Sequence, residues 1–148
     1  MKKLPEKLEE VLKEVKLTVA SSTWDCHGTP VVLHKALEKI AIHKGITFDD
    51  MKVIESSVKE KYAVISVRGH YKEATEESIG EASPYNNKNA YPFAMAEKRA
   101  KDRVILKLLE LSGDVYSQDE ADEFNLAQAL RDLDPDMRRN IEKWRKGF

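Results

Sequence analysis

The sequence contains a single cysteine, Cys26, in 148 residues. One cysteine cannot form an internal disulfide or a cysteine-rich zinc site, and it is typical of a protein from a reducing compartment. No stretch approaches the ~20 consecutive apolar residues of a membrane-spanning helix, and the first residues run into charged ones without the apolar segment of a secretory signal. The sequence therefore predicts a cytoplasmic protein with no membrane association.

An excess of charge of either sign is also absent, because 25 Lys and Arg face 26 Asp and Glu, for a net charge of −1. No overall field attracts the protein to a polyanion, so any nucleic-acid contact must come from local clusters of Lys and Arg. A composition of 41% hydrophobic and 34% charged residues is that of a folded globular protein. The length suits one domain, with or without tails.

Recognisable catalytic and cofactor motifs are missing as well. Neither G-x-x-x-x-G-K-[ST] nor G-x-G-x-x-G occurs, and the four histidines lack the paired spacing of a zinc motif. The segment Trp24–His27 puts a thiol beside an imidazole, but neighbouring loop residues rarely align as nucleophile and base. The sequence therefore predicts a protein that is not an enzyme and uses no cofactor or metal.

Hydrophobic spacing predicts helices first and strands in the middle of the chain. Helical periodicity covers residues 5–16, and Thr29 followed by Pro30 indicates the start of a second helix that ends at Gly45. Apolar residues at alternate positions then predict three strands, at 53–58, 62–71 and 73–82.

The longest predicted helix runs from Pro92 to Leu111, and two more helices are expected at 118–133 and 135–146. The predicted fold class is α+β, with a three-stranded antiparallel sheet packed against the long helix and flanked by N- and C-terminal helices. Three regions follow: an N-terminal helix and linker at 1–28, an α-β-β-β-α core at 29–113, and a helical tail at 114–148 that is acidic and then basic.

Basic residues gather on the predicted helix 92–111, within three turns: Lys98, Arg99, Lys101, Arg103 and Lys107. Arg99, Arg103 and Lys107 are spaced four apart, so they form one row beside an apolar row. Guanidinium groups bind phosphate oxygens bidentately, which makes this row a candidate phosphate site. The alternative is a solvated helix face whose cations pair with Glu97 and Asp102.

The predicted loop 83–91 combines tyrosines, asparagines and a lysine just before the long helix. Tyr85 and Lys88 are candidates for stacking on a base and for a backbone contact. The alternative is a polar loop whose tyrosines pack against the sheet.

A resemblance supports the nucleic-acid hypothesis. The segments Val67-Arg68-Gly69 through Gly80-Glu81-Ala82 and Met95 to Val104 resemble the phage single-strand annealing proteins and their eukaryotic recombination-mediator relatives. In that superfamily a glycine-containing hairpin precedes a helix with an A-E-x-R-A or K-R-A signature, which Ala96-Glu97-Lys98-Arg99-Ala100 matches. The similarity covers about half the chain, from Val31 to Leu111.

The resemblance implies a cofactor-free protein that anneals complementary single-stranded DNA during recombination and assembles as a homo-oligomeric ring or filament, in the host cytoplasm if a phage encodes it. It makes Arg99 and Arg103 the leading phosphate contacts, with Lys98, Lys101 and Lys107 in support. Arg68 on the hairpin is a weaker candidate.

Two other functions remain open. The α-β-β-β-α order also resembles a double-stranded RNA-binding domain, which recognises shape across the minor groove. The acidic stretch between Asp114 and Asp136, or the end near Trp144 and Phe148, could instead bind a protein partner.

Overall fold

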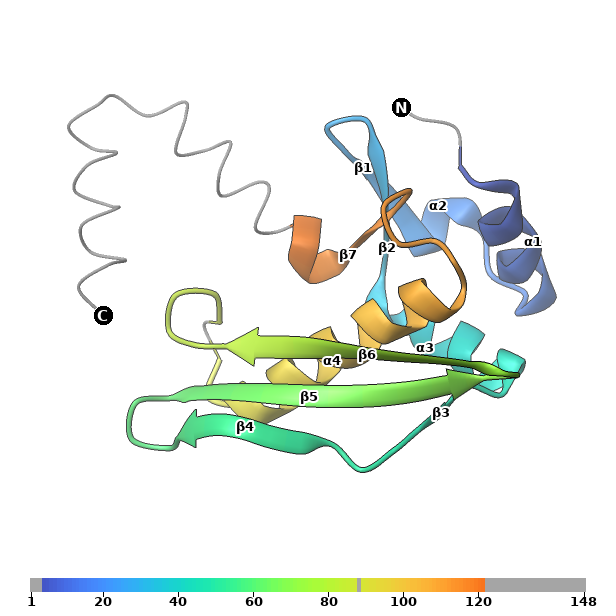
Figure 1. The fold of residues 1–148 in the computed structure, drawn as a ribbon. Coiled ribbons are helices and arrows are strands. Elements are labelled where there is room, and N and C mark those ends of the chain that lie inside the picture. Colours follow the sequence, from blue (N-terminus) through green and yellow to red (C-terminus); the bar gives the residue numbers. More distant parts are fainter. Residues whose placement is uncertain (1–3, 88, 122–148) are drawn as a thin grey trace, which may run out of the picture.

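The computed structural model describes residues 4–87 and 89–121, which form helices and two β-sheets (Figure 1). Along the chain the elements are α1 (Glu6–Glu14), α2 (Val19–Ser22), β1 (Thr23–Cys26), β2 (Thr29–Val32), α3 (His34–Lys44), β3 (Thr47–Phe48), β4 (Lys52–Ser57), β5 (Tyr62–Tyr71), β6 (Ala74–Ala82), α4 (Pro92–Leu108) and β7 (Tyr116–Ser117). The predicted α+β class is confirmed, but the strands form two sheets instead of the single three-stranded sheet predicted.

The larger sheet is built around β5. Strand β6 pairs with β5 along one side, from Tyr71 opposite Ala74 to Ala63 opposite Ala82. Strands β3 and β4 pair one after the other along the opposite side. All these pairings are antiparallel, so the three predicted strands are present and the short β3 extends the sheet to four.

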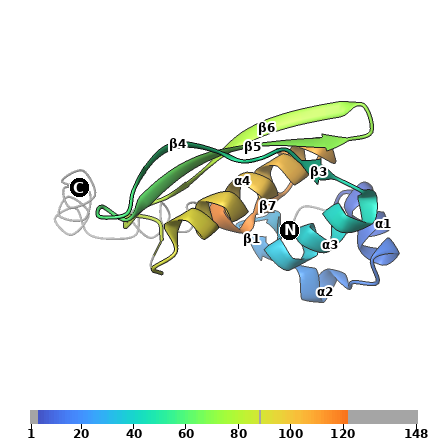
Figure 2. The same ribbon diagram turned by 90° about the horizontal axis from the view of Figure 1, so that it is seen from below.

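Helix α4 covers one face of this sheet, over β5 and β6 (Figure 2). Alternate residues of β5 (Ala63, Ile65 and Val67) are buried beneath it, and Val104 of α4 is fully buried. Helix α3 lies on the same side of the sheet and contacts α4, and α1 packs against α3. The predicted apolar stripe of α1 is confirmed, because Leu8, Val11 and Leu12 are all buried.

The smaller sheet, in the order β1-β2-β7, corrects the predicted helix start at Thr29 and Pro30. Thr29–Val32 is a strand in which every residue is buried, and α3 begins only at His34. The hairpin turn has two central residues, His27 and Gly28, with φ of 50° and 93°, as a type I′ turn requires. The β-branched residues Val31 and Val32 favour a buried strand, and this preference determines the structure here even though Thr29 and Pro30 are typical of a helix start.

The helix ends agree in part with the prediction. Gly45 ends α3 with φ of 73°, in the left-handed conformation predicted there. Helix α4 begins at Pro92 as predicted but ends at Leu108, three residues early, and Glu110 has φ of 59°.

Of the tail helices predicted at 118–133 and 135–146, only residues 118–121 are described, and these are helical; the remainder lies outside the described residues. None of the helices within residues 4–87 and 89–121 is long and apolar enough to span a lipid bilayer.

Candidate nucleic-acid interface

The segment that carries the sequence resemblance forms the junction between helix α4 and the sheet. Gly80 of β6 faces the backbone of Ala96 and Ala100, both of which are fully buried. A side chain at position 80 would separate the helix from the strand, so glycine permits their close approach. The glycine of the hairpin and the alanines of the helical signature are thus two halves of one packing contact.

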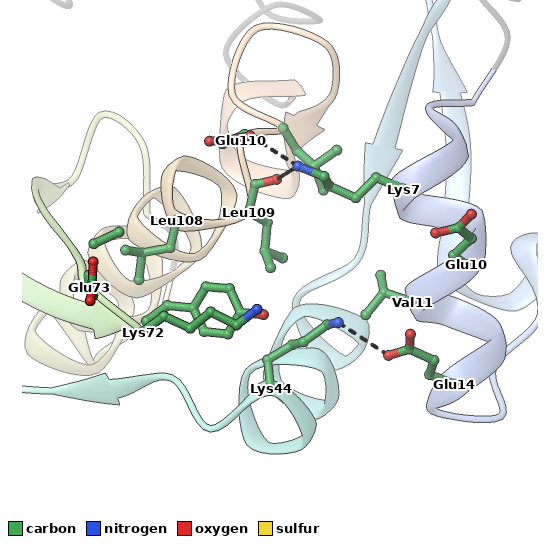
Figure 3. Close-up of a pocket in the computed structure, with 13 residues that line it drawn as sticks. Lys7, Glu10, Val11, Glu14, Lys44, Lys72, Glu73, Leu108, Leu109 and Glu110 are labelled. Carbon is green, nitrogen blue, oxygen red and sulfur yellow. Dashed lines mark hydrogen bonds and ion pairs between the residues drawn. The ribbon is translucent and has the colours of Figure 1, made fainter.

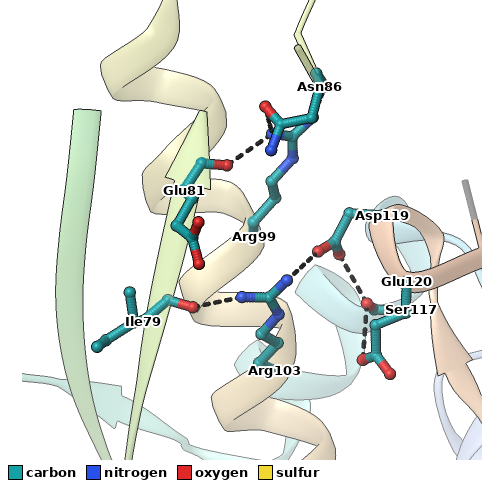
Figure 4. Close-up of polar contacts among 8 residues, drawn as sticks. All are labelled: Ile79, Glu81, Asn86, Arg99, Arg103, Ser117, Asp119 and Glu120. Atoms are coloured by element: carbon teal, nitrogen blue, oxygen red, sulfur yellow. Dashed lines mark hydrogen bonds and ion pairs between the residues drawn. The ribbon is translucent and has the colours of Figure 1, made fainter. Parts of the chain in front are cut away.

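Arg99 lies inside this junction, with 9% of its surface exposed. Its guanidinium donates hydrogen bonds to the Glu81 carbonyl oxygen at 2.6 Å and to the Asn86 carbonyl oxygen at 2.6 Å (Figure 4). A third bond reaches Oδ1 of Asn86 at 2.9 Å. Arg99 therefore fixes the loop after β6 onto the helix, and these donors are already used within the protein.

Arg103 joins three segments of the chain. It donates to the Ile79 carbonyl oxygen at 2.5 Å and to Oδ2 of Asp119 at 2.9 Å, as Figure 4 shows. Ser117 donates to Oδ1 of the same Asp119 at 2.7 Å. Arg103 retains 24% side-chain exposure, so it contacts solvent while linking β6 to the start of the tail.

Lys107 completes the row by donating to the Glu77 carbonyl oxygen at 2.9 Å. The spacing of this row along α4 matches the spacing of the outward carbonyls along β6. Four residues of a helix rise about 6 Å, and two residues of a strand span about 6.7 Å. Residues four apart on α4 thus meet successive outward carbonyls of β6. We call Arg99, Arg103 and Lys107 the edge clamp. The predicted row exists, but it binds the free edge of β6, and its phosphate-binding role stays a prediction.

The other predicted basic residues are dispersed. Lys101 pairs with Glu97 at 2.7 Å, and its ammonium lies 5.3 Å from the centre of the Phe48 ring. Lys98 lies on another side of α4, where its charge acts on His34 and Asp102. The structure does not bring these two lysines into the row.

Arg68 lies on the sheet face opposite α4, where it is close to an acidic residue. Its guanidinium is 3.6 Å from the Glu77 carboxylate, which also accepts a hydrogen bond from Ser66 at 2.9 Å. The bond from Ser66 and the charge of Arg68 lower the pKa of Glu77. On the same face, Tyr62 donates to Glu55 at 3.0 Å. Among the described residues, this face therefore combines acidic and basic groups.

The loop after β6 places its two tyrosines differently. Tyr85 is half-buried, in agreement with the packing alternative, whereas Tyr91 is 70% exposed directly before α4. Lys88 lies outside the described residues. Tyr91 is therefore the aromatic ring of this loop that is most accessible to a base, and sequence reasoning did not select it.

Exposed lysines occur at the same end of the sheet. Lys59 and Lys61 lie in the turn between β4 and β5, and both are exposed. This turn and the loop before α4 lie at one end of the molecule (Figure 1). Helix α4 begins there without a side-chain cap, so its positive dipole end is available. We call Lys59, Lys61, Tyr91 and the start of α4 the loop end.

Helices α3 and α4 are joined by a pair of titratable groups, the half-buried His34 and the buried Asp102. Nδ1 of His34 lies 2.6 Å from Oδ1 of Asp102, and Nε2 lies 3.0 Å from Glu38. Burial alone would lower the pKa of His34, but the hydrogen bond and charge of Asp102 outweigh it and raise the pKa. Burial also raises the pKa of Asp102, an effect that His34 offsets only in part. The pair is a structural link between the two helices.

A cavity of about 480 Å³ lies at the opposite end of the sheet, between α1 and the end of α4 (Figure 3). Lys7 on its wall bonds to Glu110 at 3.1 Å, and Lys44 pairs with Glu14 at 3.3 Å. These lysines attach α1 to the rest of the protein. The described residues that line the cavity carry charges of both signs, so they do not favour a ligand of one charge.

Among residues 4–87 and 89–121, no group of three or more His, Cys, Asp or Glu side chains is arranged to hold a metal ion. Comparison of the chain with family models, characterised proteins and solved structures gave no match.

Proposed function

We propose that this protein binds single-stranded DNA in the cytoplasm and promotes the pairing of complementary strands without catalysis or a cofactor. The architecture supports the proposal, because three antiparallel strands lead into a helix packed behind them. In further support, Gly80 packs against Ala96 and Ala100, so the two segments that carry the resemblance to single-strand annealing proteins contact each other.

The observation that carries the proposal is the composition of the loop end. Single-strand binding without sequence preference needs cations that follow the backbone and aromatic rings on which bases stack. Lys59 and Lys61 supply exposed cations, and Tyr91 supplies an exposed ring. The amino terminus of α4 adds backbone N–H groups suited to a phosphate.

The edge clamp takes a different part in this proposal from the one predicted by spacing. Arg99 acts as a positioning residue, because its bonds to Asn86 hold the loop that ends at Tyr91. Arg103 and Lys107 remain partly exposed and are secondary phosphate candidates.

Double-stranded RNA is the second candidate ligand. The observation that favours it is that α3 and α4 lie on the same side of the sheet and contact each other, which is the layering expected of the α-β-β-β-α alternative. Binding to a duplex would use charges near the start of α4 and need no stacking ring.

Fluorescence anisotropy with a labelled single-stranded oligonucleotide tests the proposal. We expect Lys59→Glu together with Lys61→Glu to weaken binding about tenfold or more, because two charge-assisted contacts are lost. The matched control is Lys13→Glu with Lys16→Glu, which changes one exposed lysine in the last turn of α1 and one just after it, at the other end of the molecule.

Three outcomes of this titration are informative. A decrease in affinity at the loop end alone, with a linear dependence of log affinity on log salt, supports the proposal. Equal effects of the two double variants contradict the placement of the site. Binding of duplex RNA but not of single-stranded DNA favours the second candidate.

A further inference from the structure

Strand β4 forms an open edge of the larger sheet. Within the described residues β4 pairs only with β5, and no other element packs closely against it. Apolar side chains along this edge are accessible to solvent: Met51 is 44% exposed, Val53 50%, Ile54 56% and Val58 82%. An exposed apolar edge strand is a surface to which another strand can add.

The opposite edge of the sheet is closed. The edge clamp occupies the outward carbonyls of Glu77, Ile79 and Glu81 on β6. A strand that approached β6 would have to displace these three cations. Head-to-tail addition, in which β4 of one copy pairs with β6 of the next, is therefore disfavoured. If copies associate through this sheet, the free edge must meet a second free edge.

The backbone of β4 is oriented for such pairing. In an antiparallel pair, two residues directly opposite each other either both point their backbone groups toward each other or both point them away. The carbonyls of Ile79 and Glu81 point away from β5. The β5 residues opposite them, Ser66 and Val64, therefore point their backbone groups toward β4. Lys52 and Glu55 lie opposite those two residues and bond to β5. Of the two residues between them, Val53 directly follows Lys52 and thus points its N–H and C=O outward.

A bulge between Val53 and Glu55 makes this edge complementary to itself. Residues three apart on a regular strand lie on opposite faces, but the bulge brings Lys52 and Glu55 onto the same face. With a two-fold axis between Val53 and Ile54, Lys52 of one copy stands opposite Glu55 of the other. The symmetry creates this ion pair twice.

We propose that β4 pairs antiparallel with β4 of a second copy, so that two larger sheets join into one across a two-fold axis. The charge pattern selects a second copy as the occupant, because each copy presents both the cation and the anion at complementary positions. Val53 and Ile54 lose solvent exposure on pairing. This inference is independent of nucleic-acid binding and is tested without nucleic acid.

Sedimentation velocity of the full chain over a range of concentrations tests the inference, with thermal denaturation to establish that each variant is folded. We expect a monomer–dimer equilibrium that Lys52→Glu or Glu55→Lys alone weakens about tenfold, because two attractive pairs become repulsive. The double variant Lys52→Glu/Glu55→Lys restores the opposite-charge pairs and recovers the dimer. Ile54→Lys also weakens the dimer, and Ile42→Lys, on an 81% exposed residue of α3, is its matched control.

The possible outcomes separate the proposal from other kinds of association. Recovery in the double variant supports the two-fold pairing of β4. A chain that stays monomeric at every concentration overturns the proposal. Association that both single variants leave unchanged also overturns the proposal. A double variant that dimerises as weakly as the single variants rejects the two-fold register.

Discussion

Gly80 lies so close to Ala96 that a Cβ atom added to Gly80 would stand 1.9 Å from the Ala96 carbonyl oxygen. The same atom would stand 2.6 Å from the Ala100 backbone nitrogen. Both obstacles are helix backbone, so they cannot move without shifting α4 itself. The sequence signature that suggested an annealing protein is therefore, first, a requirement of packing.

Gly80→Ala tests that packing. We expect a loss of about 3 kcal/mol in the free energy of unfolding, since the added methyl overpacks a rigid junction. Chemical denaturation measures this loss. Gly69→Ala is the comparison, because its Cβ would meet the Val104 side chain at 2.6 Å and not a backbone atom. A smaller loss in Gly80→Ala than in Gly69→Ala would contradict the account of the junction.

Arg99→Ala separates a structural role from a phosphate contact. The substitution leaves the Glu81 and Asn86 carbonyls without their buried donor, so we expect a loss of about 3 kcal/mol in unfolding free energy. Arg99→Lys recovers little of it, because an ammonium cannot reproduce the planar fork. The neighbouring Lys98→Ala serves as control and leaves the stability close to that of the unmodified protein. An Arg99→Ala variant of full stability and weak DNA affinity would instead support the original phosphate assignment.

The pair of His34 and Asp102 predicts a pH dependence of stability. Both pKa values are raised, so the folded protein holds these protons more tightly than the unfolded chain does. The contribution of His34 is complete below its ordinary pKa of 6.5 and is lost as the pH rises through its raised value. The unfolding free energy should therefore fall as the solution is made alkaline from about pH 6.5.

Thermal denaturation over a pH series measures this effect. His34→Gln removes the titrating group and should flatten the dependence, whereas His43→Gln, on an exposed residue of the same helix, should retain it. The groups that face His34 besides Asp102 are Glu38 and Lys98, and neither is altered in these variants. An equal slope in His34→Gln and the unmodified protein would assign the pH dependence to other groups.

Asp119→Asn addresses the link between Arg103 and the tail. Loss of this carboxylate frees Arg103 from its partner at 2.9 Å, so affinity for single-stranded DNA should rise if Arg103 is a secondary phosphate contact. Glu110→Gln is the control, because it removes an equal charge paired with Lys7 at the opposite end of the molecule. Equal increases in both variants, measured by fluorescence anisotropy, would show a general charge effect and exclude a specific role of Arg103.

Strand β5 and helix α4 could be predicted from the sequence because their burial follows regular periods. On β5, Ala63, Ile65 and Val67 are buried and alternate with more exposed residues, as the two-residue period predicted. Strand β2 has no such alternation, since all of its residues are buried. Its Thr29 and Pro30 also match the chemistry of a helix start, so the helix was predicted in its place.

The candidate site was less predictable for a different physical reason. Spacing identified Arg99, Arg103 and Lys107 as one row, but their acceptors on β6 are backbone carbonyls. Side-chain sequence does not indicate which carbonyls of a strand point outward, because that depends on pairing. The exposure of Tyr91 likewise depends on how Arg99 holds the preceding loop.

Strand annealing is the most direct measurement of the proposed function. Two complementary oligonucleotides, one with a fluorophore and one with a quencher, are mixed with the protein in chelator and without nucleotide. We predict that the unmodified chain accelerates quenching, that Lys59→Glu with Lys61→Glu and Tyr91→Ala each reduce the acceleration, and that Lys13→Glu with Lys16→Glu does not. A quenching rate equal to that in buffer alone would contradict the proposed function.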